Sequence, residues 1–246
     1  MKEKSKIKMK KINVICLLKI ICVVILFLFA VSFYIGRKYI KYIKYDEFAN
    51  NAWYFSEPVD SVYGAFSRVK SVLINDDDVD EIEELFSFSD YVLEIISSSD
   101  QLLLGKGVIN QANVVKIYKC SNDCDINIGD SIKIYDLVSS WGMSYINYYG
   151  GMTPLKKGDH YIVFIKKSPR PNLENVYMFS SVKYGHFNIS QETNILFDYE
   201  NGSKTFKEIS KYDYVYLKCD GAYNTCETYD NNYEKLKKEL LKMIEE

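Results

Sequence analysis

The stretch DYVLEIIS, residues 90–97, is the point at which apolar residues begin to recur at strand-like spacing. Further runs of strand character follow it, separated by clusters of Ser, Asn, Asp, Gly or Pro that favour turns. Many short strands without helices between them predict a mostly β chain, folded as a closed barrel or a sandwich. These runs are LLLGKGVI (102–109), NVVKIYK (113–119), SIKIYDLV (131–138), HYIVFIK (160–166), VYMFSSVK (176–183) and DYVYLK (213–218).

A short helix is expected just before the first strand. In NDDDVDEIEELF (75–86), acidic residues cluster where a helix N-terminus favours them, and the apolar residues after them share one face. The alternative is a calcium-binding loop, because Asp76, Asp78 and Asp80 alternate. Such a loop requires Gly at its sixth position and Glu at its twelfth, where Glu81 and Ser87 stand, so the helix is the better interpretation.

An amphipathic helix is expected at the C-terminus, over residues 231–246. Asn231 or Asn232 can cap its start. Its apolar stripe consists of Tyr233, Leu236, Leu240 and Met243.

Residues 20–36 form an uncharged run rich in Ile, Val, Leu and Phe that follows a lysine-rich start. A helix this apolar on every side and flanked by lysines belongs in lipid. We therefore predict a basic cytoplasmic tail (1–19) and a signal-anchor helix that crosses the lipid bilayer (20–36). A cleaved signal peptide is the alternative, because residues 30–32 are small enough for a cleavage site.

The charge of the two sides sets the orientation and excludes one class of partner. Lysine is in excess before the span, which predicts that this end stays in the cytoplasm and that the rest is exported to the cell surface. Residues 37–246 carry 24 Lys and Arg against 32 Asp and Glu. An acidic exported part is a poor partner for DNA or RNA, whose binding needs clustered cations, so we expect no nucleic-acid partner.

The order of motifs resembles the OB-fold of the netrin module and tissue-inhibitor-of-metalloproteinases superfamily. It is most similar to the membrane-anchored versions carried by Gram-positive bacteria. The resemblance covers roughly residues 80–190 and implies an OB-like β-barrel. The motifs that carry it are SDYVLEI (89–95), VVKIYKC (114–120), IGDSIKIYD (128–136), TPLKKGDHYIVFIKK (153–167) and YGHFNIS (184–190).

One departure from that family limits what the resemblance implies. The animal inhibitors chelate the zinc of their protease through an N-terminal cysteine. This chain begins with a lysine-rich tail, and no cysteine stands at the start of the expected barrel. Neither the inhibitory activity nor any functional residue is therefore carried over.

Four cysteines lie in the exported part. Cysteines in an oxidising exterior tend to pair, and the simplest connectivity is two local disulfides, Cys120–Cys124 and Cys219–Cys226. A crossed pairing remains open, and so does a zinc site, although zinc ribbons have tighter spacing on both sides. A C-x-x-C redox motif is absent from the sequence.

Candidate catalytic residues are few. His160 and His186 are the only histidines, and we expect both to lie on the barrel surface rather than to act as bases. Ser67 and Lys70 have the S-x-x-K spacing of some hydrolases, but the partner motifs S-D-N and K-T-G do not follow. We expect no cofactor and no metal, and no enzymatic activity.

The sequence therefore predicts a membrane-tethered binding module that contacts an envelope or surface protein. The aromatic segment 141–149, with Trp141, Tyr145, Tyr148 and Tyr149 as binding residues, is the first candidate surface; its alternative is a buried barrel strand. Two other functions stay open: a tethered hydrolase using Ser67 and Lys70, and a structural or chaperone-like subunit that docks through its last helix. The expected regions are a stalk and wrapping segment (37–79) in which Trp53, Tyr54 and Phe55 pack, the OB-like domain (80–230) and the helix (231–246).

Overall fold

The structure is a computed structural model. It describes residues 2–39, 52–57, 73–76, 79–98, 102–104, 107–121, 124–136, 138–141, 145–169, 176–217 and 232–245. The chain divides into two compact units, residues 1–42 and 43–246, which are considered separately below.

The first unit contains a single long helix, α1 (Lys2–Tyr39). Its segment Cys16–Tyr34 has a mean hydropathy of 2.9 and is not buried by any other part of the chain. This segment is long and apolar enough to cross a membrane or to serve as a signal sequence. It begins four residues before the predicted span 20–36, because Lys19 does not interrupt the helix.

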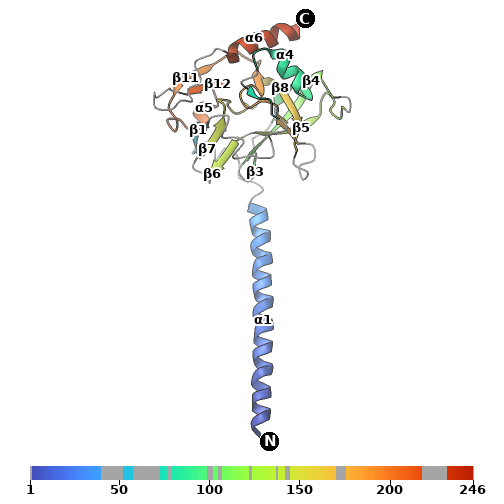
Figure 1. Cartoon of the computed structure of the whole chain (residues 1–246), viewed down its shortest axis with the longest axis vertical. Coiled ribbons are helices and arrows are strands. Elements are labelled where there is room, and N and C mark those ends of the chain that lie inside the picture. Colours follow the sequence, from blue (N-terminus) through green and yellow to red (C-terminus); the bar gives the residue numbers. More distant parts are fainter. Residues whose placement is uncertain are drawn as a thin grey trace. The chain divides into compact units, whose positions relative to one another are not determined.

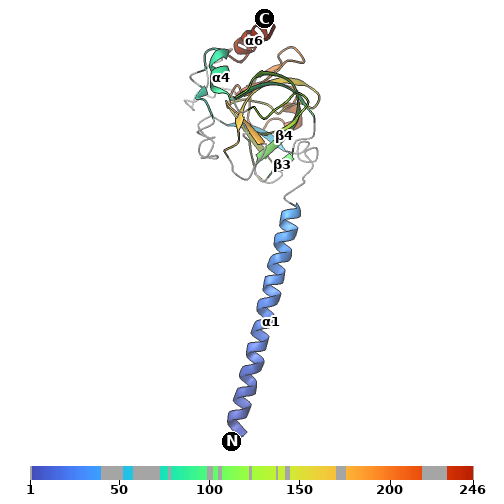
Figure 2. The ribbon, with the colours of Figure 1, turned by 90° about the vertical axis from the view of Figure 1, so that its right-hand side faces the viewer.

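The second unit is built on a closed barrel of five strands. Going round the ring, the order is β2, β4, β5, β9, β8 and back to β2. Neighbouring strands are antiparallel except for β5 and β9, which are parallel. The curved strands can be followed round the domain in Figure 2. Their bounds are β2 (Tyr91–Ser97), β4 (Gly107–Lys119), β5 (Ser131–Asp136), β8 (His160–Lys167) and β9 (Val176–Phe179), with β3 (Leu102–Leu104) paired to β4 and β10 (His186–Asn188) paired to β8.

Smaller elements lie beside the barrel, on the left of the domain in Figure 1. A three-stranded sheet places β7 between β1, to which it is parallel, and β6, and a two-stranded parallel sheet joins β11 to β12. These elements are β1 (Trp53–Glu57), β6 (Val138–Trp141), β7 (Tyr145–Tyr149), β11 (Ile195–Tyr199), α5 (Phe206–Ile209) and β12 (Tyr214–Leu217).

Apolar side chains form two cores. The larger one fills the barrel and extends beneath two helices, α4 (Ile82–Phe88) and α6 (Asn232–Glu245). The smaller one lies where the three-stranded sheet meets α5 and the β11–β12 pair, and its aromatic members are Tyr54, Tyr148, Tyr199 and Phe206. The Tyr148 ring stacks with the rings of Tyr54 and Phe206, with centroids 5.5 Å and 5.7 Å away.

Helices α4 (Ile82–Phe88) and α6 (Asn232–Glu245) are the two helices expected from the sequence. They contact each other at one end of the domain (Figures 1 and 2). Glu81 and Glu84 form a capping box at the start of α4. The stripe of α6 packs on its own barrel core through Tyr233, Leu236 and Leu240, so the face predicted to dock on a partner is already covered.

Several predicted boundaries are wrong. The runs 102–109 and 113–119 are the short β3 and one continuous β4, and the run 131–138 is divided between β5 and β6. Within the run 176–183, β9 ends at Phe179, and residues 180–183 continue as buried irregular chain. In the segment expected to wrap the domain, Tyr54 is buried as predicted, but Trp53 is 47% exposed.

Candidate functional site

The aromatic segment predicted to bind a partner forms β6 and β7. Their antiparallel register pairs Trp141 with Tyr145 and Val138 with Tyr148. Tyr148 and Tyr149 are only 1% and 4% exposed, so the expected exposed patch is not found at these two residues. The side chains of Trp141 and Tyr145 lie outside the described part of the chain.

Tyr148 can be buried without an unsatisfied polar group, since its hydroxyl has an acceptor inside the domain. It donates to a carboxylate oxygen of Asp136 at 3.3 Å, and the side-chain amide of Asn110 donates to the same oxygen at 3.2 Å. All three side chains are fully buried. They form a polar connection between β4 and β5 of the barrel and β7 of the second sheet, which is a structural role.

The cysteine loop between β4 and β5 contains the first predicted disulfide. Cys120 and Cys124 are bonded, with their Cα atoms 5.6 Å apart. The Cys219–Cys226 pair lies outside the described residues. Cys120 packs against the barrel core, whereas Cys124 is exposed. The remaining cysteines that the structure describes, Cys16 and Cys22, are unpaired and lie in α1.

Asp125, which directly follows Cys124, is a shared hydrogen-bond and ion-pair partner of several polar groups at this end of the barrel. Its Oδ1 accepts hydrogen bonds from the hydroxyls of Tyr91 at 3.0 Å and Tyr177 at 3.5 Å. Its Oδ2 pairs with the Lys167 ammonium at 2.8 Å. Ser121, which directly follows Cys120, donates to the Tyr91 hydroxyl at 3.4 Å.

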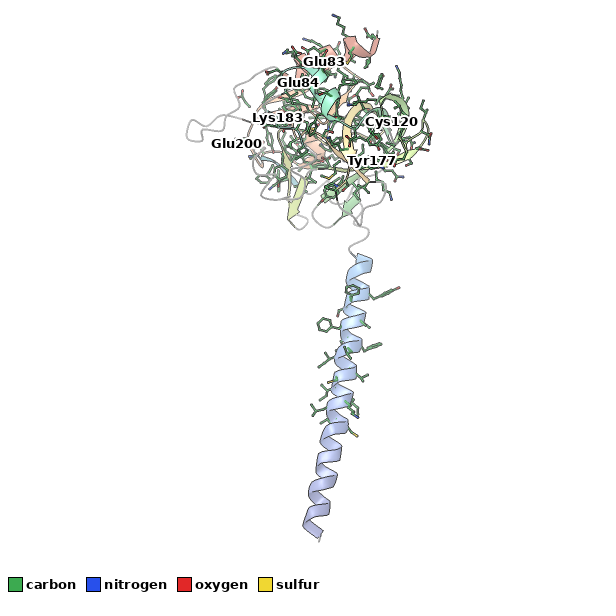
Figure 3. The ribbon with its side chains drawn as sticks, turned by 45° about the vertical axis from the view of Figure 1, so that its right-hand side comes forward. Glu83, Glu84, Cys120, Tyr177, Lys183 and Glu200 are labelled. Carbon is green, nitrogen blue, oxygen red and sulfur yellow. A yellow bond between two sulfur atoms is a disulfide. The ribbon has the colours of Figure 1, made fainter. Side chains whose placement is uncertain are left out.

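We call this group the disulfide rim. It consists of Tyr91, Cys120, Cys124, Asp125, Lys167 and Tyr177. The tyrosine rings of Tyr91 and Tyr177 meet edge to face, with centroids 5.3 Å apart, and both are nearly inaccessible to solvent. The side chains of Asp125 and Lys167 are partly exposed to solvent. Cys120 and Tyr177 are labelled on the same side of the domain in Figure 3.

The electrostatics of the rim follow from this arrangement. The hydrogen bond from the Lys167 ammonium holds the pKa of Asp125 below its usual value. Burial raises the pKa of Tyr91 and of Tyr177, and the adjacent Asp125 carboxylate raises them further. At neutral pH the rim therefore presents a carboxylate and an ammonium to solvent, and its two phenols are neutral.

The two histidines differ in their surroundings. His160 is partly exposed, as expected, and its Nδ1 lies 2.9 Å from Oε1 of Glu94. His186 is buried, which corrects the prediction that it lies on the surface. Its Nε2 donates to the carbonyl of Thr153 at 3.0 Å, and burial lowers the pKa of His186 to about 4. The ring is neutral at physiological pH and packs against Tyr161 and Phe179.

The other candidate sites give no catalytic or metal-binding constellation in the described residues. Ser67 and Lys70 lie outside them. Within them, no three His, Cys, Asp or Glu side chains are grouped closely enough to hold a metal. Asp76, the first residue of the rejected calcium loop, is buried, and it accepts hydrogen bonds from the Ser181 hydroxyl and from the backbone of Val182 and Lys183.

Of the residues in the disulfide rim, the sequence predicted only the two cysteines. Tyr91 begins β2, and Lys167 ends β8 one residue beyond the predicted strand 160–166; no local pattern in the sequence distinguishes either residue. The available signal was an aspartate directly after a cysteine in a turn. No protein-family model matches this chain, and no curated protein matches it in sequence.

Proposed function

We propose that this chain is a membrane-tethered binding module, with its N-terminus in the cytoplasm and its barrel domain at the cell surface. The observation that carries the proposal is the combination of one apolar N-terminal helix with a disulfide in the folded domain. Disulfides persist in oxidising compartments and are rare in the cytosol. The lysine excess before the helix favours the same orientation.

The barrel is proposed to be OB-like. Support comes from its strand order, in which the first, second, third, fifth and fourth strands close on the first, with the third and fifth parallel. This is the arrangement expected of a five-stranded Greek-key barrel of that kind. OB-like barrels bind many kinds of ligand, so the fold by itself does not identify the partner.

The disulfide rim is the proposed recognition surface. Asp125 and Lys167 are exposed, yet Asp125 directly follows the disulfide, accepts from two buried tyrosines and pairs with Lys167, so a partner would meet both charges already oriented. A surface that offers one carboxylate and one ammonium fits complementary charges on an envelope or surface protein. Nucleic acid is disfavoured by the acidic balance of residues 37–246.

The orientation is tested with single cysteines introduced for labelling. Ile128 is 67% exposed in the turn that follows the rim, so Ile128→Cys should react with a membrane-impermeant maleimide on intact cells. Lys4→Cys, in the N-terminal tail, is the matched control and should react only after lysis. Labelling of the tail before lysis, with the turn protected, would reverse the proposed topology.

The recognition surface is tested by photo-crosslinking on intact cells. A crosslinking side chain at Lys167 should capture a discrete envelope protein, because this position lies in the rim. Glu200 is exposed and lies on the other side of the domain from Cys120 in Figure 3, so the same side chain there is the matched control. Capture from position 200 but not from position 167 would move the binding surface away from the rim.

A further inference from the structure

The residues that follow the two cysteines also hold the hydroxyls of the two tyrosines at the rim. Cys120 is followed by Ser121 and Cys124 by Asp125, and these two neighbours make the hydrogen bonds to Tyr91 and Tyr177. The disulfide therefore links the two positions, next to Ser121 and next to Asp125, at which the tyrosine hydroxyls are bound. The Tyr91 hydroxyl has a partner at each of the two points, Ser121 and Asp125, whereas the Tyr177 hydroxyl is held by Asp125 alone.

We propose that the Cys120–Cys124 disulfide is a thiol–disulfide exchange site whose opening uncovers Tyr91 and Tyr177. The reacting partner is a dithiol reductant, either a small molecule or a protein. The inference deepens the proposed function, since it makes the composition of the proposed recognition surface depend on thiol chemistry. In the closed state the rim offers charged groups, and in the open state it adds two phenol rings.

The two sulfurs are unequally accessible, which sets the direction of attack. A thiolate of the reductant reaches the exposed Cys124 and bonds to its Sγ. The disulfide breaks, and Cys120 Sγ leaves as a thiolate that takes a proton from solvent. The second thiol of the reductant then attacks the mixed disulfide. Cys124 is released as a thiol, and the reductant is oxidised to its own disulfide.

Firm attachments on both sides confine the movement to the loop. On one side Lys119, the last residue of β4, donates from its ammonium to the carbonyls of Phe86 and Ser87 in α4. On the other side Ile126 is buried in the barrel core. Beyond it, the side chain of Asp130 accepts from the backbone of Asn127, and Gly129 adopts a φ of 92° that closes this turn. Opening the disulfide therefore releases Ser121 and Asp125 from the constraint of the ring without releasing the strands.

The test is site-resolved nitration of tyrosines by tetranitromethane in the full chain, kept in detergent micelles. The oxidised protein is compared with the Cys120→Ser/Cys124→Ser variant, and with protein that has been reduced by dithiothreitol, alkylated and freed of reductant. Nitration of Tyr91 and Tyr177 should rise by up to roughly 30-fold, the factor that closure of a five-residue ring contributes. Tyr161 and Tyr233 are buried elsewhere in the domain and should stay protected in every sample.

Other cysteines are controlled by treating the double variant with dithiothreitol as well, which should change nothing further at Tyr91 and Tyr177. Unchanged nitration of these two tyrosines in the double variant would overturn the proposal. An equal rise at Tyr161 and Tyr233 would also overturn it, because the disulfide would then hold the whole domain rather than the loop. The measurement uses neither a binding partner nor intact cells, so its failure is distinguishable from a failure of the proposed binding function.

Discussion

Two lysine–aspartate pairs in this domain have similar geometry and different surroundings. Lys167 and Asp125 of the disulfide rim approach to 2.8 Å, with side chains that are 57% and 40% exposed. Lys156 and Asp213 approach to 3.1 Å, with side chains that are 15% and 1% exposed. An exposed pair competes with water and salt, whereas breaking a buried pair leaves a charge without its partner in a medium of low polarity.

The buried pair and the exposed pair also differ in the parts of the chain that they connect. Oδ2 of Asp213 accepts from the backbone of Asn194, and the hydroxyl of Thr153 donates to the carbonyl of Asp213. The buried pair thus fixes the chain before β12 to the segment that leads into β8. The exposed pair attaches only a short loop and one side chain at the end of β8. The buried pair is therefore a structural element, and the exposed pair is the one that we propose for recognition.

The largest expected effect is that of Asp213→Ala. This substitution leaves the buried Lys156 ammonium unpaired and removes the acceptor of the Asn194 amide, so it should lower the free energy of unfolding by about 3–5 kcal/mol. Urea denaturation of the full chain in micelles measures the change. Lys167→Ala is the matched control on the exposed side; it leaves Asp125 with its two tyrosine donors and should cost less than about 1 kcal/mol. Equal losses for the two variants would remove the distinction between the pairs.

The second prediction concerns the pH dependence of stability. It involves the buried pair, because the charges of Asp213 and Lys156 both influence the pKa of His186. The folded-state pKa of His186 is about 4 against an ordinary value of 6.5, so the unfolded chain binds a proton between these values and the folded chain does not. Stability from this residue is therefore present above pH 6.5 and is lost as pH falls towards 4. The loss amounts to about 3 kcal/mol.

The measurement compares wild type with His186→Gln, which retains a donor for the Thr153 carbonyl but does not titrate. The difference between their unfolding free energies should grow by this amount between pH 4 and 7. The comparison is made by difference because burial raises the pKa of Asp76 to about 6, and this carboxyl has the opposite effect: its contribution falls as pH rises from about 4 to 6. Parallel curves for the two proteins would show that His186 titrates normally in the folded state.

The strands were predictable from the sequence wherever one face is apolar, and the failures trace to buried polar groups. Residues 110 and 111 were interpreted as a break between two strands, because Asn and Gln interrupt the apolar pattern there. In the structure β4 continues through them, since Asn110 is buried with Asp136 as its hydrogen-bond partner. The same carboxylate accepts the hydroxyl of Tyr148, which explains why a tyrosine predicted to bind a partner is in the core.

The candidate site was predictable only in its covalent part. Cysteine spacing located the loop, but the residues that give the rim its chemistry come from β2, β8 and β9, which are distant in the sequence. Their meeting depends on the closure of the barrel, which brings the start of β2 and the end of β8 together in register. His186 was placed wrongly for a related reason, since the Thr153 carbonyl that satisfies it lies 33 residues earlier.

The third prediction tests how much the disulfide of the rim contributes to the free energy of unfolding. A ring of five residues restricts the unfolded chain only slightly, so Cys120→Ser/Cys124→Ser should lower the free energy of unfolding by about 2 kcal/mol. Urea denaturation under oxidising conditions measures it, with Cys16→Ser/Cys22→Ser as the control that leaves the domain unchanged. A loss as large as that of Asp213→Ala would place the disulfide among the elements that hold the architecture.

The smallest effect is expected for Lys167→Met, which removes the ammonium of the exposed pair and keeps the length of the side chain. The loss in unfolding free energy should be below about 1 kcal/mol and should disappear in high salt, because exposed charges are screened by ions. Lys156→Met is the matched variant on the buried side. Its cost should be several times larger and insensitive to salt, because Asp213 is left buried without its cation. A salt-insensitive loss for Lys167→Met would mean that Asp125 depends on this lysine more than on the two tyrosines, and the rim would then be a structural contact like its buried counterpart.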